Sequence, residues 1–168
     1  MKNRQLYRKD ERFLRVLRTD KERVLVIDCV KKTVPKWIEL SEMKDFTECE
    51  ESELLEATGT VFAEMEELSE KQIAVMNERY TMVSGLVAFV GNDTLRNEAI
   101  AFAVEEHKIG KQSIKKYLCE FLAFNTKMAL VPKIRAKREL TDDEKNMRWS
   151  LNKFYYSMNK NSLKTAYT

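Results

Sequence analysis

The spacing of hydrophobic residues changes character near residue 40. Before it, short apolar runs rich in β-branched residues are typical of strands, and Thr19–Arg23 separates two of them like a hairpin loop. The strand-like segments are Gln5–Arg8, Phe13–Arg18, Val24–Val30 and Trp37–Leu40, the last opening behind Pro35, which cannot donate to a ladder. Because three or four short strands bury little surface alone, we expect residues 1–45 to form a small β-meander that curls into a barrel or leans on helices.

Helical signals dominate after this unit. Residues 46–68 are an acidic connector that contains a short predicted helix, Glu50–Ala57, ended by Gly59. Ser69 and Gln72 then have the capping-box spacing, and the helix that they open is expected to run to Val90. Its apolar positions, at helical spacing, are Ile73, Met76, Tyr80, Val83 and Val87.

Two further helices complete a predicted helix-turn-helix domain over residues 69–131. Asn92 and Asp93 cap the first, and a break at Glu106–Gly110 precedes the second, which starts near Lys111. The expected buried stripes are Leu95, Ala99, Phe102 and Ala103 on the first helix, and Ile114, Leu118, Phe121 and Leu122 on the second. The fold class predicted is therefore α+β and mostly α, with a barrel-like or meander β unit followed by helices.

Composition adds a few exclusions to this outline. Four Gly and two Pro in 168 residues are too few for a turn-rich sandwich, and no apolar run is long enough to span a bilayer. A basic N-terminus without an apolar signal core favours a cytoplasmic protein with no membrane contact, and nucleoid association is expected only if the chain binds DNA. Three cysteines without a Cys-x-x-Cys spacing and one histidine favour free buried thiols, so no metal and no cofactor are expected.

The net charge of +3 conceals a strong separation of charge along the chain. Residues 1–38 carry +7, residues 39–78 carry −11, residues 79–110 carry −1 and residues 111–168 carry +8. Solvated helix faces would explain this pattern, but so would two basic ends that approach a polyanion while the acidic segment faces away from it.

The helix that starts near Lys111 carries the candidate chemistry. With Ile114 at the centre of its inner face and 100° per residue, Gln112, Ser113 and Lys116 fall on the outward arc, and Lys115 falls on its shoulder. In a DNA major groove Gln112 could read an adenine edge and Ser113 a base or phosphate, while Lys111, Lys115 and Lys116 would contact phosphates. An ordinary helical hairpin with a charged face is the alternative. Lys108 stands where such turns usually have Gly, so we expect a longer or differently shaped turn.

The basic C-terminal part, residues 132–168, is predicted to be a linker and the start of a second helical DNA-binding unit. Thr141 and Glu144 have capping-box spacing, and the helix that they open is expected to continue through Met147, Leu151, Phe154 and Tyr155. The candidate phosphate contacts are Lys133, Arg135, Lys137 and Arg138 in the linker and Arg148, Asn152 and Lys153 on the helix. A further capped helix begins at Ser162, so the sequence looks like the leading part of a longer protein.

Several strings resemble the N-terminal region of bacterial Mu-type DDE transposases, of the retroviral-integrase superfamily, over essentially the whole chain. They are Val26–Lys31 (VIDCVK), Lys111–Leu118 (KQSIKKYL), Leu140–Tyr156 (LTDDEKNMRWSLNKFYY) and Asn159–Tyr167 (NKNSLKTAY), the long C-terminal ones being the most specific. The resemblance implies that helical domains bind the terminal repeats of a mobile element. It also implies that catalysis belongs to an RNase H-like domain with two Asp, one Glu and two Mg²⁺ ions further along the parent protein.

Asp10, Asp28 and the 142–144 acidic group do not match the spacing of that catalytic triad, so we expect no catalysis from this chain alone. The expected partners are double-stranded DNA at the terminal repeats, a second copy on DNA, and other transposition proteins. A free-standing helix-turn-helix regulator and a protein-interaction module remain the alternatives.

Overall fold

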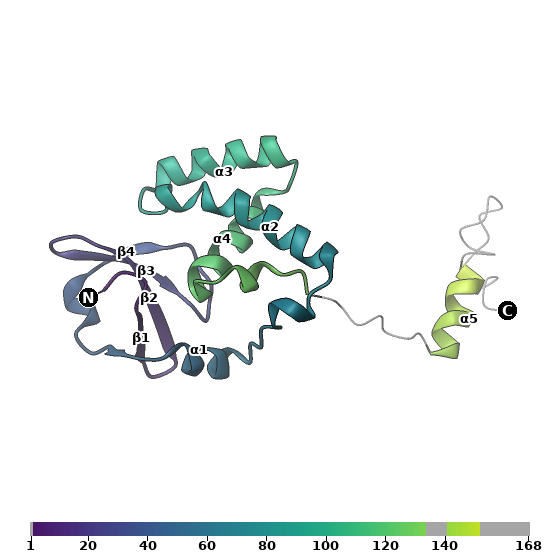
Figure 1. The fold of residues 1–168 in the computed structure, drawn as a ribbon, viewed down its shortest axis with the longest axis horizontal. Helices are drawn as coiled ribbons and strands as arrows, with labels where there is room; N and C mark the ends of the chain where they lie inside the picture. Colours follow the sequence, from purple (N-terminus) through teal and green to yellow (C-terminus); the bar gives the residue numbers. More distant parts are fainter. Residues whose placement is uncertain (1, 134–140, 152–168) are drawn as a thin grey trace. The chain divides into compact units, whose positions relative to one another are not determined.

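A computed structural model describes residues 2–133 and 141–151 of the chain (Figure 1). The contacts divide the chain into two units, Met1–Pro132 and Lys133–Thr168, which are described separately. The β unit, acidic connector and helix-turn-helix segment all fall within the first unit, and the finer boundaries at residues 45 and 68 stay predictions. The fold is α+β and mostly helical, as the sequence predicts.

The N-terminal strands form one antiparallel sheet in the order β4-β3-β2-β1-β5. The strands are β1 (Leu6–Lys9), β2 (Arg12–Thr19), β3 (Arg23–Asp28), β4 (Lys36–Glu39) and β5 (Thr47–Glu48). The sequence predicts four of them. It misses β5, a two-residue strand that brings the start of the acidic connector back to pair with β1.

Both faces of the sheet are covered, which explains why Phe13–Val16 of β2 are all buried. Tyr7, Val16 and Val26 form a small cluster with Met43 of the 3₁₀ turn η1 (Leu40–Met43). On the other face Phe13, Leu25 and Ile27 join the main hydrophobic cluster with the helices. The sheet is therefore covered by η1 on one face and packs against helices on the other, which is the second of the two predicted arrangements.

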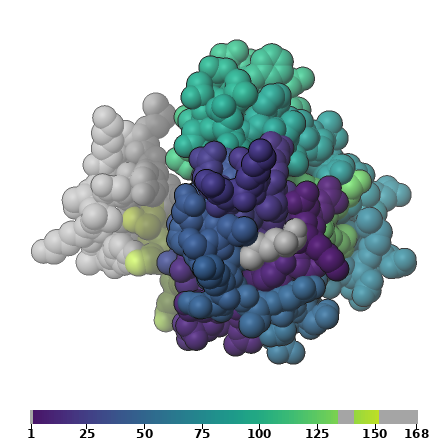
Figure 2. Space-filling model, turned by 90° about the vertical axis from the view of Figure 1, so that its left-hand side faces the viewer, coloured from purple at the N-terminus to yellow at the C-terminus, as the bar shows by residue number. Residues whose placement is uncertain are grey.

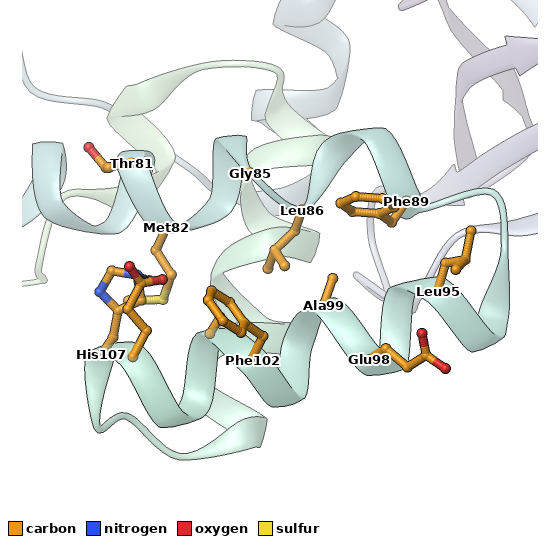
Figure 3. A pocket seen from close by; sticks show the side chains of 12 residues that line it. Thr81, Met82, Gly85, Leu86, Phe89, Leu95, Glu98, Ala99, Phe102 and His107 are labelled. Carbon is orange, nitrogen blue, oxygen red and sulfur yellow. Dashed lines mark ion pairs between the residues drawn. The ribbon is translucent and has the colours of Figure 1, made fainter.

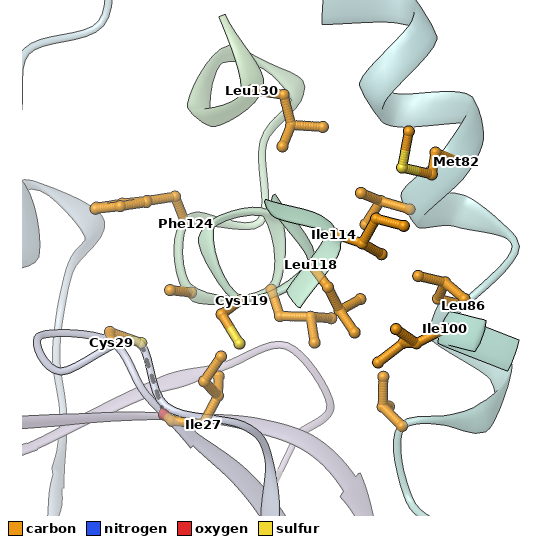
Figure 4. Close-up of a cluster of buried hydrophobic side chains, with 14 of the residues drawn as sticks. Ile27, Cys29, Met82, Leu86, Ile100, Ile114, Leu118, Cys119, Phe124 and Leu130 are labelled. Carbon is orange, nitrogen blue, oxygen red and sulfur yellow. Dashed lines mark hydrogen bonds between the residues drawn. The ribbon is translucent and has the colours of Figure 1, made fainter. Parts of the chain in front are cut away.

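The helices of this unit are α1 (Glu51–Thr58), α2 (Glu70–Ser84), α3 (Asp93–His107) and α4 (Lys111–Phe124), with 3₁₀ turns η2 (Met65–Glu67), η3 (Val87–Phe89) and η4 (Lys127–Leu130). Among them, α4 contacts α2, α3 and η4. The capping box of Ser69 and Gln72 forms as predicted, Asn92 caps α3, and Gly59 ends α1 with a φ of 61°. In Figure 4 the buried side chains of α4 point toward β3 on one side and toward α2 and α3 on the other.

One helix boundary differs from the prediction. The helix opened by Ser69 ends at Ser84, not at Val90, and η3 follows it. The Ser84 hydroxyl donates to the carbonyl of Thr81 (2.9 Å), and Gly85 is a poor helix residue, so the chain turns here. Leu86 and Val90 thereby reach the core from a separate turn.

The buried stripe of α3 also differs from the prediction. Ala103 is buried as predicted, but the structure also buries Arg96 and Ile100, whereas Phe102 is 67% exposed and Leu95 is 46% exposed. Ile100 lies about 100° around the helix from the predicted stripe and faces α4, while no helix among the described residues covers Leu95 and Phe102.

In the second unit the structure describes α5 (Asp142–Ser150). The capping box of Thr141 and Glu144 opens it, as predicted. The predicted continuation through Phe154 and Tyr155, and the helix after Ser162, lie outside the described residues. Within the described part of the chain, no helix is both long and apolar enough to cross a membrane.

Candidate nucleic-acid interface

The segment from α3 to α4 is a helix, a three-residue turn and a second helix. Lys108 adopts the left-handed conformation, with φ 55°, and its N–H donates to the carbonyl of Val104 (3.0 Å). Gly110 is extended and forms the N-cap of α4. The expectation of a longer turn is wrong, because Lys108 itself takes the conformation usually left to Gly, at a cost of about 1 kcal/mol. The turn length is that of a helix-turn-helix.

The N-terminal end of α4 presents part of the predicted recognition set to solvent. Lys111, Gln112 and Lys116 are exposed, while Ile114 on the opposite side is fully buried. Ser113 and Lys115 are half-buried. The structure thus brings the five predicted residues together over two helical turns, but Ser113 points outward less than the helical wheel predicts.

The charge of the first turn of α4 differs from that of the first turns of the other described helices. The first turns of α1, α2, α3 and α5 each carry at least one acidic residue, whereas that of α4 carries none and begins with Lys111. Gly110 has no side chain to cap the first-turn N–H groups. Within the described residues, Lys111 and Lys116 form no ion pair. The positive end of the helix dipole and these free cations together attract anions.

The C-terminal half of α4 is enclosed by other elements. Leu118, Cys119, Leu122 and Ala123 are buried, and the helix contacts β2, β3, α2 and η4. Arg79 of α2 lies over the ring of Tyr117, 4.4 Å from its centroid. Among the described residues, α4 is therefore open to solvent mainly at its first two turns.

A buried arginine fixes the far end of this helix to the sheet. Arg15 of β2 is 1% exposed, and its Nε donates to the carbonyl of Ala123 (2.8 Å) near the end of α4. Its terminal nitrogens donate to both carboxylate oxygens of Glu51 (2.6 and 2.7 Å), and one of them also donates to the carbonyl of Arg4. Sequence reasoning missed this residue, although strand alternation places it on the same face as Phe13.

Part of the basic charge of residues 1–38 is neutralised within the fold. Arg8 pairs with Glu53 (2.9 Å) and Lys9 with Asp45 (2.8 Å). The hydrogen bond from Lys9 lowers the pKa of Asp45. The pKa of Glu53 is lowered mainly by the hydrogen bond from the backbone N–H of Glu50, and to a smaller extent by the hydrogen bond from Arg8. Part of the acidic segment thus packs against the basic strands. This contact explains some of its charge without a polyanion. In Figure 2 this strand unit, purple to blue, fills the face beneath the teal helices.

The three thiols are free, as predicted for small hydrophobic residues. Burial raises the pKa of Cys29 to about 12, and burial likewise raises the pKa of Cys49 and of Cys119 to about 11. Each is therefore a protonated thiol at neutral pH. Among the described residues, no three His, Cys, Asp or Glu side chains gather where they could hold a metal ion.

The C-terminal candidates divide into described and undescribed residues. Lys133 is exposed, and Arg148 is exposed on α5 of the second unit. The other predicted contacts, Arg135, Lys137, Arg138, Asn152 and Lys153, lie outside the described residues. Among the described residues of the first unit, the candidate site is therefore the N-terminal end of α4.

Comparison with known proteins adds no family assignment. No protein-family model and no curated protein matches the chain. The transposase resemblance rests on the sequence strings alone, and the candidate site rests on the three-residue turn and the basic, accessible start of α4.

Proposed function

We propose that this chain binds double-stranded DNA through the N-terminal end of α4, as the part of a Mu-type DDE transposase that recognises the ends of the element. The observation that carries the proposal is a helix, a three-residue turn and a second helix that begins with exposed Lys111, Gln112 and Lys116. An α-helix fits the major groove, and it is the N-terminal residues of a recognition helix that meet base edges.

The division of labour between these side chains follows from their chemistry. Lys111 and Lys116 are point charges suited to phosphates, and their contacts release counterions whatever the base sequence. Gln112 carries an amide that can donate to and accept from one adenine edge at the same time. Sequence preference is therefore assigned to Gln112, and most of the affinity to the lysines.

Ser113 and Lys115 have secondary roles in this proposal. Because both are half-buried, they approach DNA only at the edge of the interface. The basic residues of the second unit, Lys133 and Arg148 among those described, would add further phosphate contacts.

The test compares the wild-type chain with the charge-reversed variant K111E/K116E. The probes are a duplex from the inverted repeats flanking the gene and a random duplex of equal length, measured by fluorescence anisotropy over a series of salt concentrations. We expect the variant to bind at least about tenfold more weakly and its slope of log affinity against log salt to be shallower by about 2. The matched control is K44E, which reverses an exposed lysine at the end of η1, and its affinity should stay close to wild type.

Two results would contradict the proposal. Equal affinity and salt slope for wild type and K111E/K116E would show that α4 is not the DNA-binding element. Equal affinity of the wild-type chain for the repeat and the random duplex would show that the chain does not recognise the ends of the element.

A further inference from the structure

A second surface of the helical unit has a different chemistry. An apolar groove of about 670 Å³ lies between α2 with η3 on one side and α3 on the other. Figure 3 shows Met82, Leu86 and Phe89 facing α3, which carries Ala99 and Phe102. We propose that this groove binds a cationic amphipathic helix of a partner protein.

The apolar side chains that line the groove are more exposed than is usual for a cluster of large apolar residues on a monomer. Phe102 is 67% exposed, Leu95 46% and Phe89 39%, and the three converge on one groove. Beneath them Met82 and Leu86 are buried and form the floor. Clustered exposed apolar side chains of this kind mark interaction surfaces, whereas scattered ones do not.

The shape of the groove selects a helix as its occupant. Its wall on α3 extends from Leu95 to His107, which corresponds to about 18 Å of helix, or three turns. Both walls are helical, so their backbone groups are already paired and offer no edge to an extended peptide. A third helix packed along the pair can place apolar side chains at i, i+4 and i+7 against the phenylalanines.

The charge of the groove selects a cationic partner. Among the described residues its lining includes the carboxylates of Glu98 and Glu106 and no Lys or Arg, and His107 lies 3.6 Å from the Glu106 carboxylate. The two carboxylates are eight residues apart on α3, about 12 Å, so basic residues two turns apart on the docked helix would reach both. Pairing of the groove with the same groove of a second copy would bring these carboxylates together, which argues against a symmetric dimer through this face.

The probe is a designed helical peptide with leucines at i, i+4 and i+7 and lysines flanking that stripe. Its matched controls are a peptide with every lysine replaced by glutamate and a peptide of scrambled order that has no apolar stripe. Binding to the full chain is followed by fluorescence anisotropy in about 0.15 M salt. We expect the lysine peptide to bind at least about tenfold more tightly than either control.

Two protein variants test the walls of the groove separately. F102D changes an exposed side chain, so the fold should survive, and circular dichroism checks this. It should weaken binding of the lysine peptide at least about tenfold. The double variant E98K/E106K should reverse the preference, so that the glutamate peptide binds more tightly than the lysine peptide. The matched control is E105K on the exposed part of α3 outside the groove, which should bind the lysine peptide like the wild type.

The results that overturn the proposal are distinct. Equal binding of the lysine, glutamate and scrambled peptides, or unchanged binding by F102D, would exclude a helix-docking groove. Self-association of the chain in sedimentation equilibrium that F102D abolishes would assign the groove to a second copy and would equally overturn the proposal. The K111E/K116E variant should bind the lysine peptide normally, which separates this inference from the DNA-binding proposal.

Discussion

The start of α4 and the groove between α2 and α3 both adjoin α3 and have opposite properties. The first is basic and polar, with Lys111 and Lys116 exposed, whereas the second is apolar and lined by the carboxylates of Glu98 and Glu106. They meet at the turn, where His107 ends the groove and Lys108 begins the link to α4.

The difference shows how one helix can serve two surfaces. On α3, the stripe of Ile100 and Ala103 packs against α4, and the stripe of Leu95 and Phe102, about 100° away, lines the groove. Because α4 is held by the sheet behind it, both surfaces share one scaffold. The largest predicted effect therefore comes from damaging that scaffold.

Replacing Arg15 with alanine should impair both surfaces together. The change removes a buried guanidinium that joins β2 to Ala123 and Glu51, leaves the Ala123 carbonyl without this donor, and opens a cavity. We expect the free energy of unfolding, measured by urea denaturation, to fall by about 3–5 kcal/mol. The matched control is R18A, at an exposed position of the same strand, which should change it by less than about 1 kcal/mol. Equal loss in both variants would show that Arg15 does not fix α4 to the sheet.

Replacing Gln112 with alanine should sharpen the contrast by acting on one surface only. We expect a loss of about 1–3 kcal/mol of discrimination at a single base pair, because one bidentate contact disappears, with little change in the salt slope. Affinities for a panel of single-substitution duplexes measure this. A uniform loss across the whole panel would instead make Gln112 a phosphate contact.

Replacing Lys108 with glycine should have the smallest effect. The left-handed conformation of residue 108 becomes unstrained, so thermal unfolding should show a gain of about 0.5–1 kcal/mol, while peptide binding in the groove stays unchanged. The matched reverse change is G59A, which places a side chain at the left-handed C-cap of α1 and should destabilise by about 1 kcal/mol. Changes of the same sign in the two variants would contradict this account of the turn.

Local signals predicted much of the fold. Runs of apolar and β-branched residues located β2 and β3, and capping residues such as Ser69, Asn92 and Thr141 located the starts of α2, α3 and α5. These signals work because a strand face or a helix cap depends on residues within a few positions of one another. The candidate site was predicted for the same reason, since Gln112, Lys116 and Ile114 are placed by one helical period.

Features that depend on distant partners could not be predicted in this way. The two-residue strand β5 exists because β1 offers an edge, and Arg15 is buried because Glu51 and Ala123 supply acceptors far along the chain. The apolar set of α3 looked like a core stripe, but burial was decided by which side of the helix α4 occupies.

The amino-acid sequence by itself therefore determined most of the elements, the caps of α2, α3 and α5 and the amphipathic start of α4, because these follow from periodicity and short-range hydrogen bonding. Only the tertiary structure decided which apolar and charged side chains are enclosed and which remain accessible. Burial depends on packing between elements far apart in the chain, and it is this packing that closes the back of α4 and leaves Phe102 in an open groove.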